Sequence, residues 1–200
     1  MTSLITLSYT YISNLKKSLN NYIDIDEFIT YFPILSLYSN NSLENSVLKS
    51  KYMINNIISK EYSIDSVDIK SPYIKRKFNA TVMNRHTHKM ESKPIFLKIN
   101  PLIDVIDHIM NNESKPLNML LPNRYVSHIV QDINDINNIA YIDSFFSFLS
   151  SKLTESGKCP TFPLYYGNYS SIINNYKYDI TEDYSSIRHF TPFKKNKNKL

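Results

Sequence analysis

The hydrophobic pattern is most regular between residues 139 and 153. Apolar residues recur there at intervals of three and four positions, at Ile142, Phe145, Phe146, Leu149 and Leu153. This spacing is typical of an amphipathic helix whose apolar stripe faces the core. We therefore predict a helix over 139–153 and expect Phe145, Phe146 and Leu149 to be core residues.

The first sixty residues carry two further patterns of helical spacing. The first covers residues 26–37, and Pro33 is expected to interrupt or end that helix. The second runs from Asn41, which forms a capping-box pattern with Glu44, to about Lys60. We expect residues 1–60 to form a helical N-terminal extension that packs on the rest of the chain.

The pattern changes after residue 60, because apolar and polar residues then alternate as they do in half-buried strands. Strands are predicted over 62–68, 73–83 and 93–99, with a polar loop at 84–91 and one or two more strands within 165–173. A short helix is predicted over 102–110.

These elements predict an α+β fold in which a small antiparallel sheet carries the 139–153 helix. The expected division is a helical extension over 1–60, an α+β domain over 61–175, and a polar segment with a basic tail over 176–200.

The positive charge of the chain is concentrated at one end. The formal net charge is +5, and four lysines lie within the last seven residues. A basic nucleic-acid-binding face is therefore not expected on the body of the protein, and nucleic acid would be contacted through the tail alone. The tail, residues 191–200, has no apolar periodicity, so we expect it to be mobile and dispensable for folding.

The composition indicates in which cellular compartment the protein is expected to be found. Cys159 is the single cysteine, so no internal disulfide can form, which suits a reducing compartment. The chain shows neither a secretory leader pattern nor an apolar run of membrane-spanning length. We expect an intracellular protein that does not enter a membrane.

Lys98 is the most informative single residue. It lies in the apolar run Ile95–Ile99, where a lysine is costly to bury unless an anion meets it. Two interpretations are open: Lys98 contacts a phosphate group, or it is an edge-strand lysine whose ammonium reaches water. Asp143, an acid inside the predicted helix, is either the ion-pair partner of Lys98 or a solvated acid in the first helical turn.

Other candidate residues are weaker. His86 and His88 could offer two imidazoles to a metal, but they lie in a polar loop without a third ligand, so no metal site is predicted. Cys159 has no arranged histidine partner and is expected to be a small buried residue, not a nucleophile.

Three segments together resemble a known family. They are FLKINPLID (residues 96–104), AYIDSFFSFLSSKL (140–153) and YYG (165–167). In this order they resemble the strand lysine, the helix and the next strand in the N-terminal, small-lobe portion of a serine/threonine protein-kinase-like family of large nucleocytoplasmic DNA viruses. The match covers under half of the chain, from about residue 93 to 169.

The resemblance implies that Lys98 binds nucleotide phosphates, that Asp143 pairs with it, and that the nucleotide is ATP. The chain departs from the kinase pattern in several places. Phe96 stands where a small residue faces the adenine, and no glycine-rich loop precedes Lys98. No His-Arg-Asp-type or Asp-Phe-Gly-type motif occurs, and only 102 residues follow Lys98, too few for a large lobe.

The sequence therefore favours a truncated viral kinase-like protein without phosphotransfer activity of its own, located in the host cytoplasm or the virion. The rival hypothesis is a non-enzymatic module that binds another protein through its tyrosines. A third treats the lysine tail as a tether for nucleic acid or an acidic partner.

Overall fold

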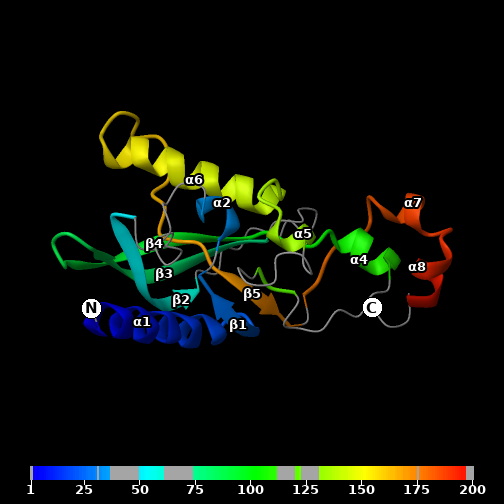
Figure 1. Cartoon of the computed structure of the whole chain (residues 1–200), viewed down its shortest axis with the longest axis horizontal. Coiled ribbons are helices and arrows are strands. Elements are labelled where there is room, and N and C mark those ends of the chain that lie inside the picture. Colours follow the sequence, from blue (N-terminus) through cyan, green and yellow to red (C-terminus); the bar gives the residue numbers. More distant parts are fainter. Residues whose placement is uncertain are drawn as a thin grey trace.

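The fold is mixed α+β, as predicted, with two antiparallel sheets (Figure 1). The computed structural model describes residues 2–30, 32–36, 50–60, 74–111, 120–122, 131–174 and 176–196. The larger sheet has the strand order β2-β3-β4, formed by Tyr52–Lys60, Ile74–Asn84 and Met90–Ile99. The smaller sheet pairs β1 (Ile25–Ile29) with β5 (Ser170–Ile173).

The main core lies between the larger sheet and helix α1 (Thr2–Asn20). Leu15 and Leu19 of α1 are buried in one cluster with sheet residues that include Phe78, Val82 and Ile95. Successive strand residues point to opposite faces, so the neighbours of Ile95 in β4 are directed away from α1. Helix α6 (Ile139–Glu155) lies on the other side of this sheet, so one layer of strands separates the two long helices (Figure 1).

A second core cluster holds α6 in place. Tyr141 and Phe148 of α6 are buried with Phe32 and Tyr165, and the short helix α2 (Pro33–Ser36) packs nearby. The backbone N–H of Tyr165 donates to the buried hydroxyl of Ser151 at 2.8 Å, which ties the segment after α6 to the helix.

The helix over 139–153 is confirmed, but its predicted buried face is partly wrong. Phe146 is 67% exposed, whereas Phe145 and Leu149 are half-buried against the second cluster. The fully buried positions include Tyr141 and Phe148 instead. The apolar residues of α6 cover only part of its circumference, and the buried positions include Ser151, so the spacing of apolar residues alone could not decide which side faces the core.

The helices predicted over 26–37 and up to Lys60 are wrong over residues 26–29 and 52–60. Residues 25–29 form β1 and residues 52–60 form β2. Pro33 begins the short helix α2 where a break was expected, which agrees with the preference of proline for the first helical position. Residues 41–49, and the strand predicted over 62–68, lie outside the described residues.

The strands predicted over 73–83 and 93–99 are confirmed as β3 and β4, which form ten register pairs from Ile74↔Ile99 to Met83↔Met90. The strand predicted within 165–173 forms only at its end, as β5. The helix predicted over 102–110 is found as α4 (Val105–Asn111), and the short α5 (Gln131–Asn134) precedes α6.

The predicted mobile tail is wrong for residues 191–196. They form helix α8 (Thr191–Asn196), which packs with α4 and with α7 (Tyr184–Ile187) at one end of the molecule (Figure 1). Phe193 is 3% exposed and packs with Ile187. One apolar side chain among lysines forms no periodic pattern, so this contact could not be predicted from the sequence. Residues 197–200 lie outside the described part of the chain.

Candidate functional site

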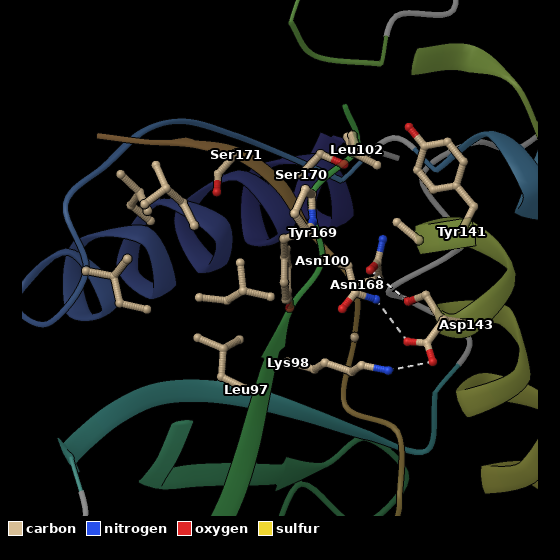
Figure 2. A pocket seen from close by; sticks show the side chains of 18 of the residues that line it. Leu97, Lys98, Asn100, Leu102, Tyr141, Asp143, Asn168, Tyr169, Ser170 and Ser171 are labelled. Atoms are coloured by element: carbon tan, nitrogen blue, oxygen red, sulfur yellow. Dashed lines mark hydrogen bonds and ion pairs between the residues drawn. The ribbon is translucent and has the colours of Figure 1, made fainter. Parts of the chain in front are cut away.

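Lys98 and Asp143 form an ion pair between a strand and a helix. The ammonium Nζ of Lys98, near the end of β4, lies 2.6 Å from Oδ1 of Asp143 on α6 (Figure 2). Asn100 lies two residues further along the chain, on the same side as Lys98, and its Nδ2 donates to Oδ2 of Asp143 at 3.0 Å. The two oxygens of one carboxylate are therefore held by two side chains from the end of one strand.

The position of Asp143 is fixed by the start of α6. Asn138 is the N-cap residue, and its Oδ1 accepts a hydrogen bond from the backbone N–H of Ala140 at 3.0 Å. Its Nδ2 donates to the carbonyl of Leu102 at 2.7 Å, on the segment that leaves β4. One side chain thus caps the helix and joins it to the end of the lysine strand, which places Asp143 one turn later beside Lys98.

A third segment, residues 163–169, lies beside the pair. The hydroxyl of Ser144 donates to Oδ1 of Asn168 at 2.8 Å, so this segment is bonded to α6 next to Asp143. Gly167 has a φ of +141°, and a Cβ there would lie 2.9 Å from the hydroxyl oxygen of Tyr169. Glycine is therefore required at this turn because both the backbone conformation and the space exclude a side chain.

These three segments line one end of a pocket of about 930 Å³. The polar end carries Lys98, Asn100, Asp143 and Ser144, whereas residues such as Ile99 and Leu102 make other parts of the wall apolar. Figure 2 shows Lys98 and Leu97 on opposite sides of β4, with Asn100 and Asn168 gathered toward Asp143. Oδ1 of Asn100 is buried and accepts no hydrogen bond from the described residues.

The ion pair is accessible to solvent. The side chains of Lys98 and Asp143 are 39% and 35% exposed. Pairs of this kind contribute about 0–1 kcal/mol to the free energy of unfolding. The pair is therefore a weak stabilising contact, and Lys98 can exchange Asp143 for another anion at little energetic cost.

The tyrosines behind the pocket stay uncharged. Burial raises the pKa of Tyr11 to about 12, and the pKa values of Tyr165 and Tyr169 are also raised by burial. The hydroxyls of Tyr11 and Tyr169 lie 2.8 Å apart in a hydrogen bond that joins α1 to this wall. No phenolate forms here near neutral pH, so these groups place no negative charge beside Lys98.

The weaker candidates do not join this cluster. His86 and His88 are exposed in the turn between β3 and β4, and the described residues contain no group of three metal-ligating side chains. Cys159 is half-buried, not buried as expected. Its Sγ lies 3.2 Å from Oγ1 of Thr161, a hydrogen bond that lowers the pKa of the thiol.

Lys98 and Asp143 could be paired from the sequence, but the asparagine side chains around them were not predicted. Asn100 could have been found from its i+2 spacing to Lys98, which places both on one side of an extended chain. Asn138 could have been found as the polar residue just before the apolar run of α6. Asn168 could not have been found from the sequence, because its contact with Ser144 depends on how residues 163–169 pack against α6.

Comparison of the chain with protein-family models, curated proteins and solved structures finds no match.

Proposed function

We propose that this chain is a nucleotide-binding module related to the small lobe of protein kinases, of the type encoded by large DNA viruses, and that it does not transfer phosphate by itself. The observation that carries the proposal is the ion pair between Lys98 on a strand and Asp143 on a helix, beside a pocket. A kinase small lobe holds nucleotide phosphates with the same two elements.

The electrostatics of the pair support a phosphate contact. A lysine buried against one carboxylate would be fixed in place, but this one is partly solvated. A nucleotide phosphate has more negative charge than a carboxylate, so it competes well for the ammonium group. Asn100 would keep its hydrogen bond to Asp143 when Lys98 turns toward the ligand, because it uses the other carboxylate oxygen.

A thermal-unfolding experiment tests the binding. ATP at a hundred times its dissociation constant should stabilise the wild type by about 2.7 kcal/mol. For a chain of this size this corresponds to a rise in Tm of roughly 5–10 °C. Lys98→Ala should lose most of this rise. No rise in the wild type at any ATP concentration would contradict the proposal.

A phosphotransfer assay tests the proposal that the chain does not transfer phosphate by itself. The reaction needs metal ligands and a base as well as a strand lysine, and the sequence carries none of the motifs that supply them in kinases. We expect no labelled phosphate on generic protein substrates with Mg-ATP. Labelling that disappears in Lys98→Ala would show that the isolated chain is a kinase.

A second candidate function, a protein-interaction module, is favoured by the outer side of α6. Ile139, Phe146 and Leu153 are exposed and stand seven residues apart, so they form a stripe along one side of the helix. The spacing is symmetric about Phe146. Two antiparallel copies would place Phe146 against Phe146 and Ile139 against Leu153, as a two-fold interface requires.

For this candidate we infer a second copy of the chain as the partner. Sedimentation equilibrium should detect dimers in the wild type, and Phe146→Asp should remove them because it places two carboxylates at the centre of the interface. A wild type that stays monomeric at the highest soluble concentration would rule the dimer out and leave nucleotide binding untouched.

A further inference from the structure

We propose that the apolar part of the pocket binds an amphipathic anion, a molecule with one negatively charged head and one unbranched hydrocarbon chain, whose head pairs with Lys98. The inference goes beyond the proposed function, because it shares only Lys98 with the nucleotide site and assigns a part of the pocket that holds no phosphate. Figure 2 shows this part, with Leu97 and Ser171 on the side of β4 away from Asp143.

The first observation is a group of apolar side chains that the main core leaves partly accessible. They come from four strands and all line the pocket: Phe28 of β1, Ile54 of β2, Leu97 and Ile99 of β4, and Ile173 of β5. Each of them packs against the main core but is only half-buried. Apolar surface in contact with water is unfavourable, and a hydrocarbon chain in the pocket would cover it.

The second observation is the shape of the cavity. Its volume of about 930 Å³ lies within the range of about 300–1,000 Å³ that is usual for small-molecule sites. Its lining runs from Leu19 of α1 past the end of β4 to Ser150 of α6. These two helices lie on opposite sides of the larger sheet (Figure 1). The cavity is therefore long in one direction, which suits a flexible chain better than a compact ring system.

The third observation is the charge of the lining. Lys98 and Lys177 are the lysines among the described lining residues, and Asp143 is the one carboxylate among them. This excess of positive charge favours an anionic head over a neutral or cationic one. Lys98 also lies between Leu97 and Ile99 in β4, so the charged contact and the apolar wall meet at the end of one strand.

A series of chain lengths tests the inference by isothermal titration calorimetry. The ligands are octanoate, decanoate and dodecanoate, each below the concentration at which it forms micelles. Every added pair of methylene groups buries more apolar surface, so the dissociation constant should fall about tenfold per step. Dodecyltrimethylammonium has a chain of the same length but a positive head, and it should bind at least tenfold more weakly than dodecanoate. Affinity that does not depend on chain length, or equal affinity for the two heads, would overturn the inference.

Two pairs of variants locate the ligand. Lys98→Ala should weaken dodecanoate binding about tenfold, and Lys152→Ala should leave it unchanged. Leu97→Asn places an amide in the apolar wall and should weaken binding at least tenfold. Leu153→Asn is its matched control, because this leucine is exposed on the outer side of α6. Wild-type affinity in both Lys98→Ala and Leu97→Asn would place the ligand elsewhere and overturn the inference.

A conservative variant separates lost binding from lost folding. Leu97→Met keeps the size and the apolar character of the side chain, so it should bind dodecanoate as the wild type does. Urea unfolding shows whether Leu97→Asn is folded. If it is not, the Lys98→Ala result and the chain-length series decide the question without it.

The amphipathic anion can be a free fatty acid or a membrane lipid, and sedimentation with phosphatidylglycerol vesicles distinguishes the two sources. Binding of dodecanoate without sedimentation supports a free fatty acid, and sedimentation that dodecanoate abolishes supports a membrane lipid. Sedimentation without any binding of dodecanoate would mean a surface contact outside the pocket, which contradicts the inference.

The outcomes also separate the inference from the proposed function. Binding of ATP without binding of dodecanoate would overturn the inference and leave the function standing. Binding of dodecanoate that depends on Lys98, without binding of ATP, would do the reverse. Because both ligands use the ammonium group of Lys98, dodecanoate should weaken ATP binding in a chain that binds both.

Discussion

Phe146 and Phe148 stand two positions apart on α6, yet they differ completely in environment. Phe148 is 3% exposed and packs edge-on against Tyr165, whereas Phe146 is 67% exposed. A shift of two positions rotates a side chain by about 200° around a helix, which carries it from the core to solvent.

This contrast gives a stability prediction. Phe148→Ala should lower the free energy of unfolding by about 3–5 kcal/mol, because it leaves a cavity in the second core cluster. Phe146→Ala should change it by less than about 1 kcal/mol. Urea unfolding of both variants provides the measurement, and an equal loss in the two would show that the orientation of α6 is wrong.

The buried tyrosine pair predicts a fall in stability at alkaline pH. The pKa of Tyr11 is raised by burial to about 12 in the folded protein, whereas an unfolded tyrosine titrates near 10. Between these values the unfolded chain binds fewer protons than the folded one, so the free energy of unfolding decreases as pH rises from about 10 to 12. The contribution of Tyr11 is fully present below about pH 10.

Tyr11→Phe removes one of the two phenols from this linkage. Between about pH 10 and 12 the free energy of unfolding of this variant should therefore fall by about 2–3 kcal/mol less than that of the wild type. Chemical unfolding at a series of pH values would measure it. Identical slopes in wild type and variant would mean that Tyr11 is not buried against Tyr169.

At the scale of single residues, Lys98 and Asp143 could be selected from sequence because both are unusual where they stand. One is a lysine in an apolar strand, and the other is the single acid within the apolar run 139–153. Phe96 could be noticed but not interpreted, because only the structure places its ring in solvent. The hydroxyl pair of Tyr11 and Tyr169 joins residues 158 positions apart, a distance at which local pattern carries no information.

At the scale of elements, the start of α6 matters most for the site. Asn138 caps the helix and also bonds to Leu102, so it fixes where Asp143 meets Lys98. Asn138→Ala should lower the free energy of unfolding by about 0.5–2 kcal/mol through loss of the cap.

The same variant should also weaken nucleotide binding, because α6 loses its connection to the lysine strand. Asn138→Asp is the informative control, since it keeps an oxygen for the cap but loses the donor to Leu102. We expect Asn138→Asp to retain most of the stability and to bind nucleotide less well, as measured by urea unfolding and calorimetry. Full binding by both variants would contradict a positioning role for Asn138.

The strand β2 shows why a helix was predicted in its place. Its pairing with β3 shifts register between Ile54 and Asn56 and again between Ile57 and Ser59. Each irregularity breaks the two-residue alternation of a strand. As a result Ile54 and Ile57, which pair with Val82 and Ala80 on one face of β3, stand three residues apart, which is a helical spacing. The partner strand that imposes this conformation lies outside the local sequence window.

At the scale of the whole molecule, the C-terminal helices form a small cluster of their own. Ile187 and Phe193 are buried there, against half-buried Val105 and Ile106 of α4. Helix α4 follows directly on the segment that leaves the lysine strand, so this cluster is connected to the site through Leu102 and Asp104. The described helices include none that is both long and apolar enough to cross a membrane.

Phe193→Ala tests whether this cluster contributes to global stability. We expect it to cost about 3–5 kcal/mol if the cluster unfolds together with the body. Lys194→Ala is the adjacent control and should have little effect, since this lysine is exposed. Differential scanning calorimetry would measure both, and a wild-type Tm in Phe193→Ala would mean that α8 is not docked.

The α+β class and the antiparallel sheet could be predicted from sequence, because the longest alternating segments become β3 and β4 in simple pairing. The role of the first sixty residues could not be predicted in this way. Strand β1 pairs with β5 across more than 140 residues, and β2 joins the larger sheet. An N-terminal region that looked like a helical extension is therefore part of both sheets.

Calorimetric titration with ATP can decide whether Lys98 binds the phosphate of a nucleotide, as we propose. Lys152 is a matched control on the same molecule, because its Nζ pairs with Glu155 at 2.7 Å and its side chain is 37% exposed. We expect Lys98→Ala to weaken ATP binding about 10- to 100-fold, the loss of one charge-assisted contact, and Lys152→Ala to bind as the wild type does. Equal affinities in all three proteins, or an equal loss in both variants, would contradict the claim.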